Sequence, residues 1–545
     1  MKFLKAVDRS AAQALRDLGE EWLEETCGLF PEFASRLGFK KFEPLLGENT
    51  PDVHRRNRRL LKSTLARVED LPEEAFRGDD WLDRRGLVAH LRTGLLFSRD
   101  LARWRTDPQV HCSAAVDAVF DLIVRNQGNL ARALPSIESR LAKLPDFLAA
   151  GAECVRRPVP LWTSLAVRSC AGAVEFLDGV EEALAAVSDH PKRTRLLVRS
   201  AARGFRDYAR QIEKVRQGRA GDFAVGRERF EFLVRERLGI DLSLREVRAV
   251  GERLVARHDY LLQKEAARLG TRAARELIDE AAAQWTPDGP LIDLYRKTTA
   301  AIKGRLAAAD LVSLPKGESL KVLPVPPFLR HQFPTAAYHP PQPFARTQAG
   351  IFWVNDLSLT RTDPDKRLAE VRQHFGLDLT CVHEAYPGHH LQFVVQYRHP
   401  SRLRRLFEHA IFYEGWTMWC EKLAVENRLV DVPHARLVQL HDALWRAHRI
   451  VIDCGLQEGS LTPAAAALRL QESIGFTPAR ASGDVNWYTS SPTVPMSYLL
   501  GRLEVEKLHR HLVGGEGWSL RQFNDWMLSH GSLPWSWIWQ ARLRG

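Results

Sequence analysis

The eight-residue segment HEAYPGHH, which begins at His383, constrains the local fold more than any other part of the chain. Its histidines can bind one metal ion only if their rings come together. An unbroken helix would instead separate His383 and His389, six residues apart, by about 9 Å. Pro387 lacks the amide hydrogen that a helix interior needs, and Gly388 tolerates unusual backbone angles. We therefore expect the helix to be interrupted between the two histidines.

Without its Pro-Gly pair the segment would read His-Glu-Ala-Tyr-His, which has the HExxH spacing of zinc peptidases. In that spacing the two histidines bind the ion and the glutamate acts as a general base. The sequence thus predicts His383 and His389 as metal ligands and Glu384 as the base, with His390 as the alternative second ligand. Tandem histidines can equally be ordinary surface or core side chains, so the prediction depends on further residues.

A third ligand is expected, because catalytic zinc sites keep three protein ligands and one open position. The segment FYEGWTMWCEKL has a helical pattern and contains Glu414 and Glu421, which can lie on one face of a helix. The pair His399-Pro400 supplies a turn before it, so two antiparallel helices would bring the ligands together. Glu414 is the predicted third ligand and Glu421 is its alternative. Solvated glutamates are common, but the aromatic neighbours of Glu414 argue against full exposure.

Two strand-like runs precede the motif in an otherwise helical sequence, Ser319–Phe328 and Ala349–Asn355. An edge strand beside a zinc-binding helix commonly binds the backbone of a peptide substrate. Asn355, at the end of the second run, is therefore predicted to lie near the substrate. A small structural hairpin is the alternative interpretation.

The strings HEAYPGHHLQ and FYEGWTMWCEKL, with KVLPVPPF, GIFWVN and the closing GSLPW, resemble the DUF885 family of bacterial metallopeptidases over nearly the whole chain. The resemblance implies a mainly α, two-lobed fold like that of zinc carboxypeptidases and oligopeptidases, with a deep cleft and a small β element near the metal site. It also implies one Zn²⁺ or another divalent metal ion per chain, and hydrolysis of peptide or peptide-like amide bonds. The residues it implies for the site are His383, Glu384, His389 or His390, and Glu414.

The chain departs from the family pattern on the substrate side of the predicted site. Gln457 stands where a histidine is expected, and Trp487 stands where an arginine is expected. Tyr488 is kept, and it is predicted to donate a hydrogen bond to the oxyanion that forms during amide hydrolysis. These departures leave a second hypothesis open, in which a catalytically altered or inactive relative binds peptides or a partner protein.

Asp453 follows Arg449 by four residues in a helical pattern, so the two side chains can meet on one face. They are predicted either to orient a ligand or the substrate, or to form a buried pair with a structural role only. Two histidines and one carboxylate also bind the iron of non-haem oxygenases, which is a third hypothesis. The adjacency of His383 and Glu384 favours zinc-dependent hydrolysis over iron chemistry.

The overall composition is that of an ordinary globular protein of 545 residues. Its 78 basic and 67 acidic residues give a net charge of +11, but the basic residues are scattered along amphipathic helices, so no nucleic-acid partner is expected. The seven cysteines are dispersed, which predicts a reducing compartment and no disulfide framework. Neither a signal peptide nor a membrane span is evident, so we expect a cytoplasmic protein that acts on a small peptide or amide substrate.

The helical periodicity predicts a single continuous structural unit made of two lobes, a helical front lobe (1–313) and a metal-bearing catalytic lobe (314–545). The clearest amphipathic helices are expected at 113–133, 193–217 and 244–268. The clearest interruptions, rich in proline and glycine, are expected at 156–161, 286–290 and 314–344.

Overall fold

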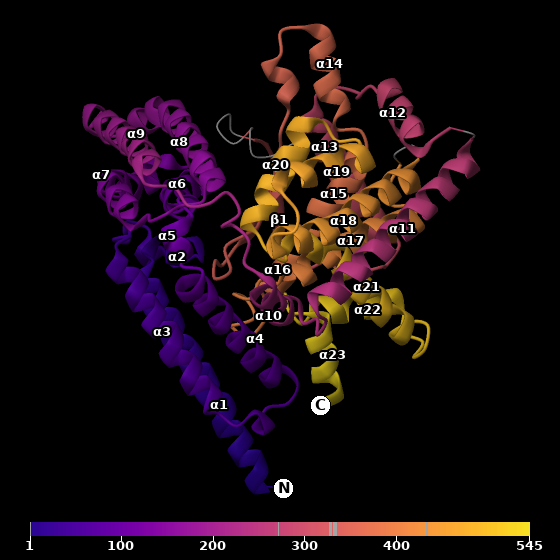
Figure 1. Cartoon of the computed structure of the whole chain (residues 1–545), viewed down its shortest axis with the longest axis horizontal. Coiled ribbons are helices and arrows are strands. Elements are labelled where there is room, and N and C mark those ends of the chain that lie inside the picture. The colour runs from indigo at the N-terminus through magenta and orange to yellow at the C-terminus, as the bar shows by residue number, and fades with distance from the viewer. Residues whose placement is uncertain (1, 271, 326–329, 331–334, 432–433, 545) are drawn as a thin grey trace. The chain divides into compact units, whose positions relative to one another are not determined.

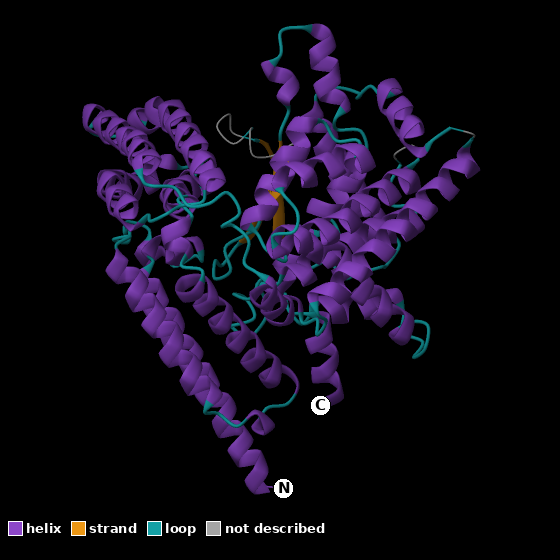
Figure 2. Cartoon of the chain, viewed as in Figure 1, coloured by secondary structure: helices purple, strands orange, loops and turns teal. Residues whose placement is uncertain are grey.

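The computed structural model describes residues 2–270, 272–325, 330, 335–431 and 434–544. The fold is mainly α, as the sequence predicts, with one small β-sheet (Figures 1 and 2). Contacts divide the chain into two compact units: Met1–Phe223 with Gln342–Ala345, and Ala224–Pro341 with Arg346–Gly545. The sequence suggests a boundary after residue 313, whereas the contacts place the helices that follow Phe223 in the same unit as the predicted metal ligands.

The first unit is helical throughout its described elements. Its α helices are α1 (Lys2–Leu29), α2 (Pro31–Arg36), α3 (Pro51–Glu69), α4 (Gly78–Leu95), α5 (Arg103–Thr106), α6 (Gln109–Arg125), α7 (Leu130–Cys154), α8 (Pro160–Ala186) and α9 (Pro191–Lys214). Shorter turns are the 3₁₀ helices Lys40–Phe42 and Glu73–Ala75 and a π-helical turn at Leu96–Asp100. The segment 113–133, which was expected to form one helix, belongs to two helices, because α6 ends at Arg125 and α7 begins at Leu130.

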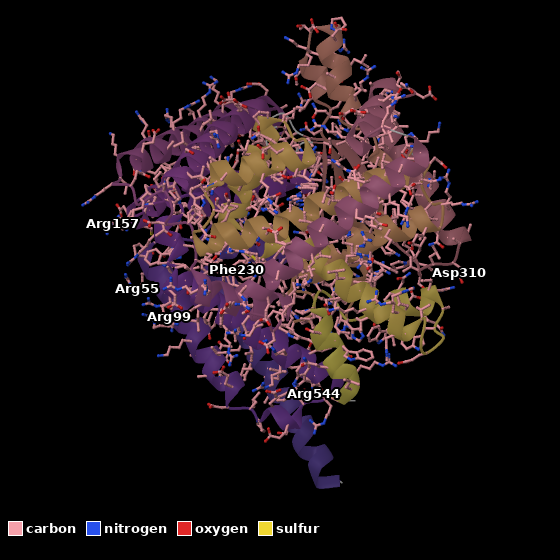
Figure 3. The ribbon with its side chains drawn as sticks, turned by 45° about the vertical axis from the view of Figure 1, so that its right-hand side comes forward. Arg55, Arg99, Arg157, Phe230, Asp310 and Arg544 are labelled. Atoms are coloured by element: carbon pink, nitrogen blue, oxygen red, sulfur yellow. The ribbon has the colours of Figure 1, made fainter. Side chains whose placement is uncertain are left out.

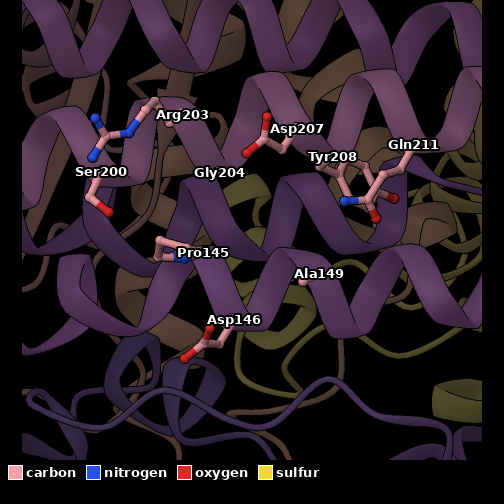
Figure 4. Close-up of a pocket in the computed structure, with 9 residues that line it drawn as sticks. All are labelled: Pro145, Asp146, Ala149, Ser200, Arg203, Gly204, Asp207, Tyr208 and Gln211. Carbon is pink, nitrogen blue, oxygen red and sulfur yellow. The ribbon is translucent and has the colours of Figure 1, made fainter.

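Helices α7 and α9 pack closely because α9 carries a glycine at the contact. A Cβ atom on Gly204 would lie 3.0 Å from Cα of Pro145 in α7. A hollow of about 280 Å³ opens along the same two helices and is bordered by Asp146, Arg203 and Asp207 (Figure 4). Its described residues contain no group of metal-ligating side chains.

The second unit carries the sheet and the remaining helices. Its α helices are α10 (Arg227–Leu238), α11 (Leu244–Leu269), α12 (Ala274–Gln284), α13 (Leu291–Ala308), α14 (Pro364–Arg372), α15 (Leu377–Glu384), α16 (His389–Gln396), α17 (Ala410–Glu426), α18 (Ala435–Glu458), α19 (Pro463–Ile474), α20 (Pro478–Ser490), α21 (Val494–Leu512), α22 (Leu520–Leu528) and α23 (Trp535–Arg544). A 3₁₀ helix spans Leu357–Thr360.

The sheet has the strand order β1-β3-β2. Strand β1 (Glu318–Pro324) runs parallel to β3 (Gln348–Val354), and β2 (Ala336–His339) runs antiparallel to it. The register pairs Val322 with Phe352 on one side and Phe352 with Tyr338 on the other. Both predicted strands are confirmed within the described residues, while residues 326–328 of the first run lie outside them. The edge strand β2 was not predicted, because its four residues are too few to show a period.

Helices α17 and α21 cross at a pair of glycines in the centre of the second unit. A Cβ atom on Gly415 would lie 2.6 Å from Cα of Gly501, and one on Gly501 would lie 2.2 Å from the carbonyl oxygen of Ile411. The two backbones therefore touch without intervening side chains. This close crossing brings residues of α21 against the carboxylates of α17.

Charges and cysteines are distributed as the sequence suggests. Basic side chains such as Arg55 and Arg99 reach out from the ribbon and are about half exposed (Figure 3). All seven cysteines are buried thiols outside any disulfide. In the described part of the chain, every helix is too short or too polar to cross a lipid bilayer.

Candidate metal centre

The predicted helix interruption lies between α15 and α16. Helix α15 ends at Glu384, a cis peptide bond precedes Pro387, and α16 begins at His389. At the turn, the amide of Gly388 donates to the carbonyl oxygen of Val382, 3.0 Å away. A Cβ atom on Gly388 would lie 1.9 Å from the carbonyl oxygen of His383, so only glycine fits this turn. The chain folds back tightly enough to bring the two histidine rings together.

The turn is fixed to α17 by one hydrogen bond. The indole of Trp416 donates to the carbonyl oxygen of Pro387, at 2.8 Å. Because Trp416 follows Glu414 by two residues, this bond sets the distance between the turn and the predicted third ligand. The bond and the turn therefore position all three predicted ligands together.

The side chains of His383, His389 and Glu414 form one buried cluster. The ligand atoms that they offer all lie within 4.8 Å of one another. Nε2 of His383 and Nε2 of His389 each lie 3.6 Å from Oε2 of Glu414, and the ring centroids of the two histidines are 4.9 Å apart. The structure thus brings together the three residues that the sequence selects as primary ligands.

The geometry of this cluster fits a metal ion. Three atoms, each about 2.1 Å from a tetrahedral ion, lie about 3.4 Å from one another. The two nitrogen–oxygen separations of 3.6 Å are close to this value, and all three ligand atoms lie within 4.8 Å of one another. Oε2 of Glu414 is sealed from solvent and has no hydrogen-bond partner, which is costly for a carboxylate without a bound cation. Two histidines and one carboxylate are donors that zinc accepts readily, with one position left open.

Electrostatics also favour a cation in the cluster. Burial alone would raise the pKa of Glu414, but the charges of His389 and His383, whose Nε2 atoms each lie 3.6 Å from its Oε2, hold it well below its usual range. Burial alone would lower the pKa of His383, but the nearby carboxylate of Glu414 and the hydrogen-bonded carboxylate of Glu421 raise it to about 10. Without an ion, the cluster therefore holds a proton on His383, which a metal ion would displace.

Glu421, the alternative third ligand, lies behind His383. Its Oε1 accepts a hydrogen bond from Nδ1 of His383 at 2.8 Å, and Arg446 lies 3.8 Å from the same oxygen. A carboxylate on the far nitrogen fixes the tautomer of a ligand histidine and leaves Nε2 free to bind metal. Glu421 therefore orients His383, and the ligand cluster does not contain it.

His390, the alternative second ligand, faces a different group of residues. Its Nε2 lies 2.6 Å from Oε2 of Glu318 in β1, and its Nδ1 lies 3.0 Å from the hydroxyl of Tyr338 in β2. Lys303 and Tyr386 also bond to Glu318, so hydrogen bonds and nearby charges outweigh burial and lower the pKa of that carboxyl to about 2. This network holds His390 away from the cluster and anchors the start of α16 to the sheet.

Glu384, the predicted general base, stands next to the cluster at the end of α15. Its carboxylate accepts a hydrogen bond from the backbone amide of Tyr338, and no cation of the described residues forms an ion pair with it. Burial is the largest influence on its pKa, which is raised above the usual value despite the nearby histidines. A carboxylate with a raised pKa and no cationic partner is suited to accept and return a proton.

The two tyrosines near the cluster differ from expectation. The hydroxyl of Tyr488 donates to Asp484 at 3.1 Å and accepts from Arg449 at 3.0 Å, so it is committed within α18 and α20. Tyr498 of α21 lies beside the ligands instead, with its ring 6.4 Å from that of His383. Burial and the charge of the nearby Glu414 raise the pKa of Tyr498 well above its usual value. Tyr498 is therefore a protonated donor at the cluster.

Asp453 and Arg449 are both buried, but they do not form the predicted pair. The carboxylate of Asp453 accepts from the backbone amide of Thr493 at 3.0 Å, at the start of α21. Arg449 donates from Nε to Tyr488. Asp453 thus holds a helix terminus, and Glu421 provides the orientation of His383 that was expected from Asp453.

The remaining predicted residues lie around this core. Gln457 donates from Nε2 to the carbonyl oxygen of Tyr488 and accepts from the amide of Val225, so it joins backbone segments. Trp487 is 37% exposed, and its ring lies 5.1 Å from the guanidinium of Arg449. Asn355 is fully buried and donates to the carbonyl oxygen of Arg330. The predicted contact of Asn355 with the substrate stays a prediction.

Several residues at the site carry no sequence signal strong enough to find them. Tyr498 lies in an apolar run, Glu318 begins a strand, and Tyr338 lies in a strand too short to recognise. Arg446 precedes Arg449 by three residues, so the sequence predicts that both side chains lie on the same face of a helix. The sequence pattern does not reveal that its partner is Glu421, which it offers only as the alternative third ligand.

Comparisons with known proteins place the chain in a family. The sequence profile of a family described as "Bacterial protein of unknown function (DUF885)" matches residues 31–541. A search among curated proteins finds no significantly similar sequence.

Two solved structures have the same fold. One is described as a "putative lipoprotein of unknown function" from Shewanella oneidensis, with a TM-score of 0.75, 18% identity, and coverage of 97% of this chain and 99% of that one. The other is a "putative lipoprotein" from Colwellia psychrerythraea, with a TM-score of 0.74, 18% identity, and coverage of 97% and 98%. At this identity the likeness shows the fold, and the cytoplasmic location stays a prediction.

Proposed function

We propose that this chain, which belongs to the DUF885 family, is a metal-dependent hydrolase that cleaves peptide or peptide-like amide bonds of small substrates. The observation that carries the proposal is the buried convergence of His383, His389 and Glu414, with Glu384 beside it. Three ligands and an adjacent carboxylate base are the parts that zinc-dependent amide hydrolysis needs.

The roles of the side chains follow from their positions. A divalent ion held by His383, His389 and Glu414 would polarise a water molecule and the substrate carbonyl. Glu384 takes a proton from the water as its oxygen bonds to the carbonyl carbon. Tyr498 donates a hydrogen bond to the carbonyl oxygen as that oxygen gains negative charge. Glu384 then gives the proton to the nitrogen of the leaving amine as the C–N bond breaks.

Zinc is the proposed ion, although the same ligand set also serves other divalent metals. The carboxylate of Glu384 has no cationic partner and so is available as a base, which favours hydrolysis over the oxygen chemistry of non-haem iron. At the changed positions, Gln457 contacts the backbone of Tyr488 and Trp487 contacts Arg449. Neither change therefore removes one of the three proposed ligands.

Glu384→Gln tests the proposal. The zinc-loaded protein is incubated with a pool of N-acetylated tetrapeptides, and the products are followed by mass spectrometry. We expect the variant to keep its zinc and to lose about 10²- to 10⁴-fold in rate, because it lacks the base. The matched control is Glu426→Gln, which removes an exposed carboxylate that pairs with Lys422 at 2.7 Å. Equal activity in the native protein and Glu384→Gln, or no cleavage by fully zinc-loaded native protein, would contradict the proposal.

A further inference from the structure

Arg449 is a buried cation surrounded by aromatic rings. Its side chain is 4% exposed, and its guanidinium carbon lies 4.2 Å from the ring centroid of Tyr498. The rings of Trp445, Trp487 and Tyr488 lie 4.7, 5.1 and 5.2 Å from the same atom. Aromatic faces attract a guanidinium and hold it flat, but they do not supply a counter-charge.

No carboxylate of the described residues forms an ion pair with Arg449. Asp484 is the nearest candidate along α20, but the hydroxyl of Tyr488 donates to it. The neighbouring Arg446 differs, because it lies 3.2 Å from Asp442 and 3.8 Å from Glu421. Buried charges are normally paired, so an unpaired guanidinium indicates a counter-ion that comes from outside the chain.

The two terminal nitrogens of Arg449 are available to such an anion. Only Nε is used in a hydrogen bond within the described residues, to the hydroxyl of Tyr488. Neither Nη1 nor Nη2 is among the nitrogens that are sealed from solvent without a partner. The hydrogen bond from Nε and the aromatic rings packed on the guanidinium fix its orientation. Its two Nη atoms can then donate two parallel hydrogen bonds to the two oxygens of a carboxylate.

Arg449 also lies close to the predicted metal centre. The ring of Tyr498 contacts the guanidinium of Arg449. It also stacks near the ring of His383, with 6.4 Å between the ring centroids. The charge of Glu414 acts on both Tyr498 and Arg449. One aromatic side chain therefore connects the unpaired cation to a metal ligand.

We propose that Arg449 binds the C-terminal carboxylate of the substrate, so that the chain is a carboxypeptidase that releases a C-terminal amino acid or dipeptide. The inference rests on the proposed hydrolase function and names its substrate class. One extended peptide residue spans about 3.5 Å and two span about 7 Å. A C-terminal segment of this length suits Arg449, which is separated from the ligand His383 by the ring of Tyr498. Water supplies the oxygen of the new carboxylate, and its protons go to the leaving amine and the solvent.

A binding experiment tests the inference independently of catalysis. Zinc-loaded Glu384→Gln is mixed with two pools of N-acetylated tetrapeptides that differ only in a free or an amidated C-terminus. Peptides that stay with the protein through rapid gel filtration are counted by mass spectrometry. We expect the free acids to be retained about 10- to 100-fold more than the amides, because a charge-assisted bidentate pair forms only with the acid.

Arg449→Met and Arg449→Lys, each added to the Glu384→Gln protein, test whether Arg449 causes the preference for free acids. Arg449→Met should abolish it, and Arg449→Lys should keep part of it, since lysine retains the charge without the fork. The matched control is Arg480→Gln, because exposed Arg480 lies 5.3 Å from the same ring of Trp445. It should change the preference less than about twofold, as expected for a screened surface charge. Circular dichroism and zinc content confirm that each variant is folded.

The outcomes separate the two proposals. If free acids are retained over amides in a way that depends on Arg449, but the native protein cleaves no peptide, the carboxylate site would be supported and the hydrolase proposal would be contradicted. Cleavage of acids and amides at equal rates, with equal or no retention, would keep the hydrolase and overturn the carboxylate site. A preference that survives in Arg449→Met, or that Arg480→Gln removes equally, would also overturn the assignment to Arg449.

Discussion

At the scale of single residues, the proposed metal centre depends on side chains that lie outside its ligand set. Glu421 fixes the ring of His383 from behind, and Arg446 lies beside that carboxylate. On the other side, Glu318 holds His390 so that the adjacent His389 turns to the cluster. Ligand histidines are commonly oriented in this way, and the partner carboxylate raises their basicity.

Glu421→Gln should therefore weaken zinc binding without removing a ligand. We expect the zinc dissociation constant to rise about 10- to 100-fold, because the amide carries no charge to support the imidazole. Competition with a chromogenic chelator measures the constant. Glu426→Gln on the same helix serves as the control and should leave it unchanged. An unaltered dissociation constant in Glu421→Gln would show that this carboxylate does not support the ligand.

Tyr498→Phe should lower the rate of hydrolysis more than it lowers substrate binding. Loss of one hydrogen bond to a developing oxyanion typically costs about 10²- to 10³-fold in kcat. The exposed Tyr260→Phe is the control, at 64% exposure. Steady-state kinetics on one cleaved peptide give kcat and KM separately. If only KM changed, Tyr498 would contribute to binding and not to the reaction.

The sequence predicts which side chains converge in the buried cluster, but it does not predict the donors around them, for a physical reason. His383, Glu384 and His389 lie in one short segment whose spacing has a chemical meaning. Tyr498 and Glu318 reach the site through tertiary packing, and each lies among residues typical of any helix or strand. The two tyrosines also show the limit of proximity in sequence. Tyr488 is predicted as a donor because the family pattern keeps it, but folding commits its hydroxyl to Arg449 and Asp484.

At the scale of elements, glycines determine how closely the site-bearing segments approach. Gly388 permits the turn between α15 and α16, and the pair Gly415 and Gly501 permits the crossing of α17 with α21. The first could be predicted, because a Pro-Gly pair between two ligands demands a break. The second could not, since a glycine within a helix does not reveal which helix will pack on it.

Gly501→Ala should disturb both stability and the metal site. The added methyl group would lie 2.2 Å from the carbonyl oxygen of Ile411, so α21 must move away from α17. Overpacking of this kind costs about 1–3 kcal/mol or more in the free energy of unfolding. Urea unfolding and zinc content measure the two effects. The control is Gly483→Ala in α20, where a Cβ atom has no neighbour within 4 Å. Equal stability of the two variants would contradict the account of the crossing.

At the scale of the whole molecule, the metal centre belongs to one of two compact units. All three ligands and Glu384 lie in the unit of Ala224–Pro341 and Arg346–Gly545. Length and composition suggested a two-part chain, but the helices of 224–313 carry no sequence signal that assigns them to either part. Their packing against later helices, such as α11 against α18, decides the assignment.

Zinc should therefore stabilise the second unit selectively. A ligand at 100 times its dissociation constant stabilises the state that binds it by about 2.7 kcal/mol. We expect removal of zinc by a chelator to speed hydrogen exchange in α15–α17, while α9 of the first unit stays unchanged. Exchange followed by mass spectrometry resolves both regions in one sample. Equal changes in α9 and α17 would contradict a centre confined to the second unit.

The most direct test of the metal centre is the metal content of the protein, purified without added metal, beside that of Glu414→Ala prepared in parallel. The account predicts about one zinc ion per chain in the native protein and its loss in the variant, because Glu414 completes the three-ligand set. Iron in place of zinc would move the function toward oxygen chemistry. No stoichiometric metal in the native protein, even after incubation with zinc, would contradict the account.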